Sequence, residues 1–581
     1  MTDGPRSTGD LRKALAAGYA CIAAWAEVLD RINVFPVPDG DTGRNLVLSL
    51  APLRDLAGSD TAVAEHLLMS ARGNSGNIAC AFVRALFDGA PGESLSAGFV
   101  AGAASARKAV AIPQPGTMLT VLDALAEAAK PGLTAKSVPG LLADLAIVVQ
   151  GTTAAQESLR KSDVVDSGAL GMLVFLGGLL RTYHGLAEGG DALAASFRSL
   201  VRFDRASAMG HSEKGFCVDA VLRVPAGCHP PDEALAHIGS EVVALRQGDL
   251  WKVHLHAGDA ELARAALGGV GEVVSWSWDD LHEQISASPL VAAEGDVHIV
   301  TDGAASLTRR DAEAWGVTLL DSHVDFGDRS LPETRLDPAD VYRAMRRGVR
   351  VSTAQASTYE RHMHYERLAA QWRHVLYLCV GSVYTGNHAV ASAWCASHAS
   401  GERMTVVDSG AASGRLAVVV RATAKAARGG TGVSALAELA TASLQLAEEF
   451  IFVERLEYLA RGGRLSKTGA WFGDALGLAP VVSPMPDGAR KVALLRKPEE
   501  RVAFAVAQVQ RAFCSGSGRG YLLAEYSDNR AWVEEILLPR LRGAAPEAKM
   551  TAGPLSLTTG AHTGPGTWAI AMLPERPAQG A

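Results

Sequence analysis

The change in hydrophobic spacing near residue 215 is the feature that most constrains how this chain folds. Over residues 10–200, apolar side chains recur every three or four positions, which is the spacing of amphipathic helices. The first such stripe consists of Leu11, Leu15, Gly18, Ile22, Trp25 and Leu29. This region shows no convincing alternation of apolar and polar residues, the pattern of a half-buried strand. We therefore expect an all-α helical domain over residues 1–205.

Alternation begins after Gly215. Residues 216–222 (FCVDAVL) and 251–256 (WKVHLH) predict two strands, and Glu233–Ala244 between them reads as a helix. These elements predict a small α+β module over residues 210–285. Residues 284–295 have the composition of a linker.

A third pattern starts at residue 297. The short apolar runs Val297–Asp302, Val375–Val380 and Met404–Val407 are each followed by a helical stretch. Buried strands that alternate with helices indicate a parallel sheet. We expect an α/β fold with two subdomains over residues 296–575.

Composition excludes several classes of protein. The 581 residues suit three or four domains, and a net charge of −7 without a long basic run disfavours nucleic-acid binding. The longest apolar run, Gly168–Leu180, is about half the length that spans a bilayer, so we expect no integral membrane segment. Seven scattered cysteines favour a reducing cytoplasm over a disulfide framework.

The densest polar segment is NVFPVPDGDTGRN, residues 33–45. Asp39 and Asp41 lie two residues apart in a turn, where their carboxylates can converge on one hard cation such as Mg²⁺, with Asn33 adding an amide oxygen. An isolated Asp-Gly-Asp is also an ordinary turn with a helix N-cap. Three loop-to-helix junctions strengthen the site hypothesis, because glycine-rich loops and helix N-termini suit anionic phosphate: ARGNSGN (71–77), PGTMLT (115–120) and DSGALG (166–171).

Cys217 lies on one predicted strand, and His254 and His256 lie on the other. Residues i and i+2 share a strand face, so a neighbouring strand could complete a Cys-His-His zinc set with an open fourth position. The alternative is two half-exposed histidines and one buried cysteine. If zinc binds, we expect a structural or domain-ordering role.

Hydroxyl-bearing loops recur in the C-terminal half, at residues 352–357, 381–386, 407–410 and 560–566. Hydroxyls and an imidazole at the carboxyl ends of parallel strands can hold a carboxylate by hydrogen bonds. Each loop alone is also compatible with an ordinary turn.

Residues 10–200 resemble the nucleotide-binding DhaL (Dak2) domain of dihydroxyacetone-kinase-type phosphotransferases, and in particular the ATP-binding subunit of bacterial fatty acid kinase. The motifs NVFPVPDGDTGRN, ARGNSGN, PGTMLT and VVDSGALG carry the resemblance. It implies a helical barrel that binds ATP or ADP through Mg²⁺ held by Asn33, Asp39 and Asp41. The nucleotide would contact Thr42, Asn45, Asn74, Ser75, Gly76, Thr117, Met118 and Asp166. Pro115 and Ala169 depart from the family pattern. GFCVDAVL and WKVHLHAGD resemble the middle domain of the same subunit, which implies Zn²⁺ on Cys217, His254 and His256.

Residues 296–575 resemble the DegV family, the fatty-acid-binding partner of fatty acid kinase, through TDGAASL, LEYLARGGRLSK and GAHTGPG. The resemblance implies that Thr353 and Thr385 hold a fatty-acid carboxylate, with His562 nearby. Ala354, Ala356, Gly303 and the pair Asn387-His388 depart from the family pattern. Arg461, Arg464 and Lys467 could dock the kinase module, help to neutralise phosphate, or form a solvated basic turn.

Together these resemblances imply a fusion of a kinase module with its acyl carrier, which transfers phosphate from ATP to a bound fatty acid. The product, an acyl phosphate, would feed an acyltransferase of phospholipid metabolism, and transfer could occur within one chain or across a homodimer. Two alternatives stay open: a lipid carrier with a degenerate kinase scaffold, and a kinase for another small substrate such as a hydroxy-ketone.

Overall fold

The structure, a computed structural model, describes residues 8–56, 58–88, 94–186, 197, 200, 215–225, 235–281, 296–461, 479–514 and 518–575. The chain divides into two compact units: Met1–Leu290 with His362–Ala370, and Val291–Arg361 with Gln371–Ala581. The predicted linker at 284–295 lies outside the described residues.

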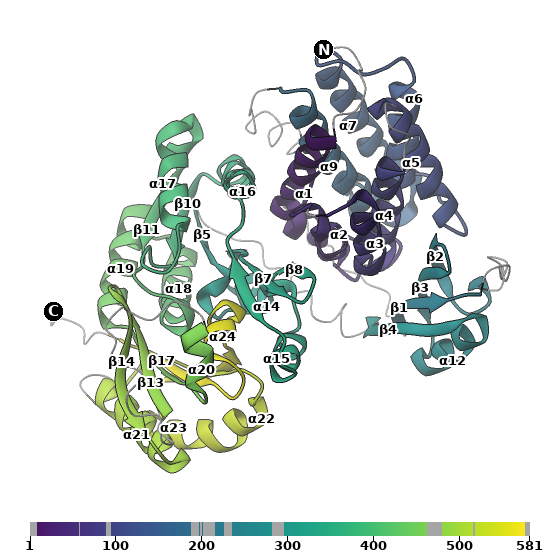
Figure 1. The fold of residues 1–581 in the computed structure, drawn as a ribbon. Helices are drawn as coiled ribbons and strands as arrows, with labels where there is room; N and C mark the ends of the chain where they lie inside the picture. The colour runs from purple at the N-terminus through teal and green to yellow at the C-terminus, as the bar shows by residue number, and fades with distance from the viewer. Residues whose placement is uncertain are drawn as a thin grey trace. The chain divides into compact units, whose positions relative to one another are not determined.

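The N-terminal part of the first unit is helical throughout its described residues, as the spacing of apolar residues predicted (Figure 1). The α-helices are α1 (Thr8–Arg31), α2 (Thr42–Leu50), α3 (Asp60–Ser70), α4 (Gly73–Phe87), α5 (Leu95–Ala109), α6 (Met118–Ala129), α7 (Val138–Ala155), α8 (Glu157–Ser162) and α9 (Ser167–Tyr183). Helix α9 is buried from Ser167 to Leu180 and lies against α1, where a Cβ on Gly18 would come within 2.8 Å of Phe175. Close helix packing therefore explains the glycine within the first apolar stripe.

Helix α7 is long and apolar enough to cross a membrane by length and composition alone, with a mean hydropathy of 1.4. A third of that window (33%) is buried inside the fold. One such helix is weak evidence for a membrane span, because core helices pass the same test.

In its described residues, the middle module has a four-stranded antiparallel sheet with strand order β2-β3-β1-β4, and a helix packs against β1 and β4. Its elements are β1 (Phe216–Arg223), β2 (Ser240–Gln247), β3 (Leu250–Ala257), α12 (Ala260–Val270) and β4 (Glu272–Asp280). Val218, Ala220, Trp251, Val253 and Leu267 form its apolar core.

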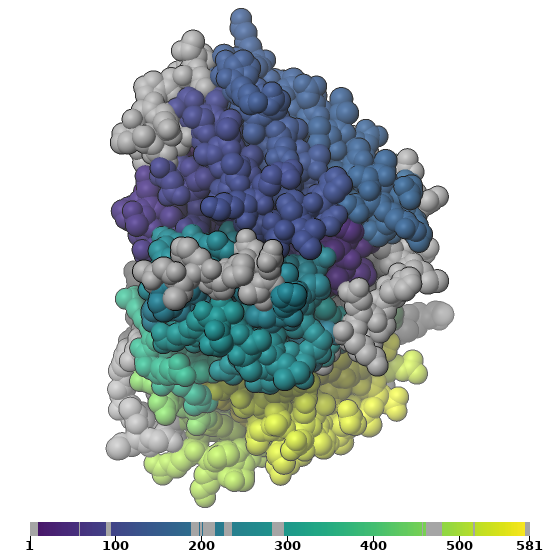
Figure 2. Space-filling model, turned by 90° about the vertical axis from the view of Figure 1, so that its right-hand side faces the viewer, coloured from purple at the N-terminus to yellow at the C-terminus, as the bar shows by residue number. Residues whose placement is uncertain are grey.

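The helix expected over Glu233–Ala244 was wrong from Ser240 onward. Strand β2 begins there, because β-branched Val242 and Val243 fit a pleated edge and Val243 pairs with His254 on β3. Leu235 and Ala236 are helical, and residues 233–234 lie outside the described part of the chain. The module lies against the helices of its own unit, and Figure 2 shows its teal surface beneath their violet surface.

The second unit contains the predicted parallel sheet, with strand order β11-β10-β5-β6. Its strands are β5 (Val297–Asp302), β6 (Val317–Leu320), β10 (His374–Cys379) and β11 (Met404–Asp408). A small antiparallel sheet, β8-β7-β9, contains β7 (His323–Phe326), β8 (Arg329–Pro332) and β9 (Val351–Ala354).

A six-stranded sheet, β14-β13-β12-β17-β15-β16, forms the other subdomain and is antiparallel except for the pair β15–β16. Its strands are β12 (Glu448–Phe452), β13 (Ala479–Met485), β14 (Gly488–Leu495), β15 (Gly520–Tyr526), β16 (Lys549–Pro554) and β17 (Trp568–Pro574). The helices of this unit are α14 (Arg309–Trp315), α15 (Pro338–Arg346), α17 (Asn387–Ser397), α18 (Ser413–Arg428), α19 (Val433–Leu446), α20 (Leu456–Arg461), α21 (Pro498–Phe513), α22 (Arg530–Trp532), α23 (Leu538–Ala544) and α24 (Leu557–Thr563). Helix α16 (Thr358–Gln371) contributes His362–Ala370 to the first unit.

Candidate functional site

Three helices of the first unit begin at one cavity of about 480 Å³. Helices α4, α6 and α9 start at Gly73, Met118 and Ser167, and Asn74, Thr117 and Asp166 line the cavity at these ends. Ser75 and Met118, also predicted to contact nucleotide, line it as well. Because helix N-termini carry partial positive charge and N–H donors, this convergence favours an anionic ligand.

Asp166 caps α9 by accepting a hydrogen bond from Ala169 N at 2.7 Å. Burial raises its pKa to about 7, although hydrogen bonds from Ala169 and Met118 oppose the shift. Ala169 departs from the family pattern, but its backbone N–H still donates to the capping carboxylate.

The two predicted metal carboxylates meet in a smaller adjoining cavity. Asp39, Asp41, Asn33, Thr42 and Asn45 line it, and Asn33 Nδ2 donates to Asp39 Oδ1 at 2.6 Å. Asn74 and Ser75 line both cavities, so the carboxylates lie beside one end of the larger one.

Burial and neighbouring acids raise the pKa values of this carboxyl pair. The pKa of Asp41 is raised to about 6, mainly by burial and then by the charge of Asp30. The pKa of Asp39 is raised by burial and by the charge of Asp41. Buried carboxylates that repel one another are stabilised by a cation, and their hard oxygens suit Mg²⁺. The residues therefore fit the metal that the sequence resemblance implied.

Two glycines of the ARGNSGN segment, both in the first turn of α4, have steric roles. Gly73 has φ +59°, and a Cβ there would lie 2.1 Å from Asn45 Nδ2. A Cβ on Gly76 would lie 2.0 Å from Ser49 Oγ, so Gly76 serves the crossing of α4 and α2 and lines neither cavity.

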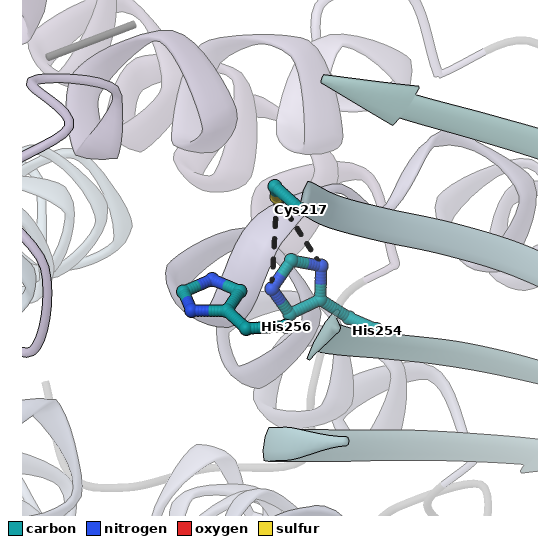
Figure 3. A group of neighbouring side chains, drawn as sticks. All are labelled: Cys217, His254 and His256. Atoms are coloured by element: carbon teal, nitrogen blue, oxygen red, sulfur yellow. Dashed lines mark hydrogen bonds between the residues drawn. The ribbon is translucent and has the colours of Figure 1, made fainter. Parts of the chain in front are cut away.

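Cys217, His254 and His256 come together as the strand spacing predicted (Figure 3). The antiparallel register sets Cys217 opposite His256 and Asp219 opposite His254. Cys217 Sγ lies 4.0 Å from each ring nitrogen of His254, and one ligand atom from each of the three residues lies within 4.8 Å of the others. This donor set fits a zinc ion with an open fourth position.

The electrostatics of the trio also fit a cation. Burial and then His254 lower the pKa of His256 to about 3, which leaves the neutral imidazole that binds metals. Burial and the nearby Asp219, Asp41 and Asp39 raise the pKa of the Cys217 thiol, a shift that a bound metal reverses.

The trio lines the same small cavity as Asp39 and Asp41, which the sequence did not predict. Two further charged side chains on this sheet face, Asp219 and Lys252, were also missed, and they are only 11% and 7% exposed. Asp219 Oδ1 lies 3.3 Å from His254 Nδ1 and 3.4 Å from Lys252 Nζ. Burial alone would raise the pKa of Asp219, but Lys252 and His254 hold it below its usual range. The same i, i+2 rule that paired the histidines could have found both residues.

The second unit contains a cavity of about 130 Å³ that Thr353, Thr385 and His562 all line, so the structure brings the predicted carboxylate ligands together. Thr353 Oγ1 lies 3.3 Å from His562 Nε2. Apolar side chains line another part of this cavity, namely Ile451, Leu459 and Val482. Of the predicted basic turn, Arg461 ends α20, and Arg464 and Lys467 lie outside the described residues.

A buried carboxyl pair, Glu449 and Glu525, lies next to this cavity. Ser413, which lines the cavity, donates to Glu525 Oε1 at 3.1 Å, and Arg415 N donates to Glu449 Oε2 at 2.8 Å. Burial raises the pKa of Glu449 to about 7; burial and Glu449 raise that of Glu525 as well. The pair therefore holds a proton at neutral pH.

Comparison with known proteins agrees with this division of the chain. The family model described as "DAK2 domain" matches residues 36–181, and the model described as "Uncharacterised protein, DegV family" matches residues 296–575. The chain thus belongs to the multidomain proteins that pair a helical DAK2 domain with an α/β domain. More specifically, it is a fusion of a DAK2 domain with a DegV-family domain.

Among curated relatives, protein YloV of Bacillus subtilis is 29% identical over 303 residues, covering 46% of this chain and 54% of the relative. An uncharacterised protein of Staphylococcus aureus USA300 is 30% identical over 264 residues, covering 40% and 47%. The chain spans about half the length of the curated relatives it matches.

Among solved structures, a fatty-acid-binding DegV family protein from Thermus thermophilus is 22% identical and aligns with 48% of this chain and 99% of its own, at a TM-score of 0.44. DegV of Bacillus subtilis, a fatty acid binding protein, is 17% identical and aligns with 48% of this chain and 100% of its own, also at 0.44.

Proposed function

We propose that the chain is an ATP- and Mg²⁺-dependent kinase that phosphorylates the carboxylate of a fatty acid bound in its DegV-family domain. One observation carries the proposal: the half-buried pair Asp39 and Asp41 lies beside a cavity onto which three helices point their N-termini. A site for a triphosphate needs a cation and N–H donors together. This unit has carboxylates that would hold the cation and helix N-termini that supply the donors.

Asn33, Asp39 and Asp41 would hold Mg²⁺, which supplies neutralisation of phosphate charge when bound. Asn74, Ser75 and Thr117 would orient the phosphates through their side chains and the adjoining helix N-termini. A fatty-acid carboxylate is ionised at neutral pH, so its oxygen attacks the γ-phosphorus without a general base. The bond from the γ-phosphorus to the bridging oxygen breaks, and ADP leaves with that electron pair.

Cys217, His254 and His256 would hold Zn²⁺. Their place in the cavity of Asp39 and Asp41 supports a role at the reacting phosphate, in addition to the structural role expected from the sequence. The zinc ion would add a second positive charge where the transferred group develops negative charge.

Thr353, Thr385 and His562 would hold the fatty-acid carboxylate, and Ile451 and Val482 would contact the acyl chain. The names of two structurally similar proteins describe fatty-acid binding, which supports this assignment.

The test is ADP release by the purified full chain with Mg²⁺ and ATP, with and without a long-chain fatty acid, after native mass spectrometry has recorded any co-purified lipid. We expect ADP release that depends on fatty acid. Lipid binding without any stimulated ADP release would leave a lipid carrier as the function.

A further inference from the structure

The 480 Å³ cavity has walls from two parts of the first unit. Asn74, Thr117 and Asp166 come from the helical domain, whereas Gly239, Ser240 and Glu241 come from the middle module, at the start of β2. A nucleotide in this cavity would therefore touch both parts.

The phosphate end of the cavity can be assigned from its neighbours. Asn74 and Ser75 also line the small cavity of Asp39 and Asp41, so the phosphates belong there. Val110, Ile112 and Val242 line the larger cavity but not the small one, and they are apolar. An apolar wall with a few polar groups suits a base and its sugar. The nucleoside end therefore lies against β2.

Backbone pairing fixes β2 at this place. Val110, which follows α5, forms an antiparallel bridge with Val243, and Ala111 N donates to Val242 O at 3.2 Å. At the other end of β2, Arg84 Nη2 of α4 donates to Gln247 Oε1 at 3.0 Å. The loop that leads to Thr117 is thus extended onto the edge of the middle module's sheet.

Glu241 lies at an irregularity in β2. Ser240 pairs with His256 and Val243 with His254, so Glu241 and Val242 together oppose Leu255 on β3. Glu241 has φ +53°, a left-handed conformation that is unfavourable for glutamate. Bulges of this kind re-aim side chains beside functional sites, and Glu241 lines the cavity.

We propose that the middle module forms the nucleoside wall of the cavity and that Glu241 is a specificity-determining residue, whose carboxylate accepts a hydrogen bond from a hydroxyl or amino group of the nucleoside. This inference rests on the proposed ATP-binding function and adds to it that nucleotide binding requires the module to be docked on the helices. Nucleotide binding would then stabilise the docked position of the module, and docking would raise the affinity for nucleotide by the same factor.

Hydrogen exchange of the full chain, with and without Mg²⁺ and ADP, tests the wall. We expect slower exchange in the peptides that cover residues 73–77 and 117–120 and, in addition, in the peptide that covers 239–243. Protection of the helical peptides alone would contradict the proposed nucleoside wall and leave the proposed function standing. No protection in any of them would contradict both.

Calorimetric titration tests Glu241 itself. For Glu241→Gln we expect an ADP dissociation constant about five- to tenfold above that of the wild type, as for loss of a charge-assisted hydrogen bond. Glu261→Gln on α12 is the matched control in the same module and should bind as the wild type does. Titration with 2′-deoxy-ADP assigns the donor: an effect of Glu241→Gln that disappears with this ligand identifies the ribose 2′-hydroxyl, and an effect that persists identifies another donor of the nucleoside. An unchanged ADP affinity in Glu241→Gln would overturn the assignment.

Discussion

Asp219 on β1 and His254 on β3 face each other across the antiparallel pair, with Asp219 Oδ1 3.3 Å from His254 Nδ1. Asp219 Oδ2 also accepts a hydrogen bond from Gly73 N at 3.4 Å, at the start of the ARGNSGN helix. One carboxylate thus lies beside an imidazole of the Cys-His-His trio and accepts a hydrogen bond from the N-terminus of α4, next to Asn74 and Ser75. A carboxylate in this position fixes the histidine tautomer and raises its affinity for a metal.

Asp219→Asn should therefore weaken zinc binding by about 10- to 100-fold without removing the site. Competition with a chromophoric chelator measures the affinity, and the absorption spectrum of the Co²⁺-substituted protein reports the ligand geometry. Cys217→Ser should instead lose about one equivalent of zinc. Asp249→Asn, an exposed acid between β2 and β3, is the control. Equal zinc affinity in Asp219→Asn and Asp249→Asn would contradict the positioning role.

Asp41→Ala should lower Mg²⁺-dependent ATP turnover by about a hundredfold or more, because the transferred phosphate loses its cation. Lipid binding and the far-ultraviolet circular dichroism spectrum should not change, because Asp41 lies in a loop before α2. Asp144→Ala, an exposed acid on α7, serves as control. Near-normal turnover in Asp41→Ala would show that the carboxylate pair is not the metal site.

The pair Glu449 and Glu525 predicts a pH dependence of stability. The pKa of Glu449 is raised to about 7, so its protonated form stabilises the fold below about pH 4 and this contribution is lost as the pH rises through 7. The free energy of unfolding of the wild type should fall by on the order of 2 kcal/mol between pH 5 and pH 8 because of this group. Calorimetric unfolding of the full chain measures it in the transition that shifts when fatty acid is added.

Glu449→Gln should flatten that pH dependence, because a neutral amide replaces the group that must ionise. Glu448 is the neighbouring residue on β12 and pairs with Arg511. The control variant Glu448→Gln should keep the pH dependence of the wild type. Parallel pH profiles for Glu449→Gln and the wild type would rule out the shared proton.

Thr385→Ala should weaken fatty-acid binding by only about 1–2 kcal/mol, because the acyl chain supplies most of the binding free energy. Phosphoryl transfer should fall further, since a displaced carboxylate no longer lies in line with the γ-phosphate. Lipid affinity and acyl-phosphate yield are measured side by side, with the exposed Thr441→Ala as control. Equal losses in binding and in transfer would mean that Thr385 only binds.

Periodicity predicted those parts of the site that lie within one strand or one loop. The i, i+2 spacing of His254 and His256 was sufficient to place both imidazoles on one face, and a Pro-Gly turn was sufficient to bring Asp39 and Asp41 together. The meeting of these two groups was not predictable, because it depends on how the middle module docks on the helical domain, and Cys217 follows Asp41 by more than 170 residues. The bulge at Glu241 interrupts the alternation of β2, so the sequence of that strand predicted a helix instead.

The activity that we propose for this chain is transfer of phosphate from ATP to a fatty-acid carboxylate. The most direct measurement is hydroxylamine trapping of acyl phosphate as the hydroxamate, with the full wild-type chain, Mg²⁺, ATP and a long-chain fatty acid, quantified by mass spectrometry. We expect hydroxamate in amounts that match the ADP released, and about a hundredfold less or lower still from Asp41→Ala. Bound lipid and bound ATP without any hydroxamate from the wild type would contradict it.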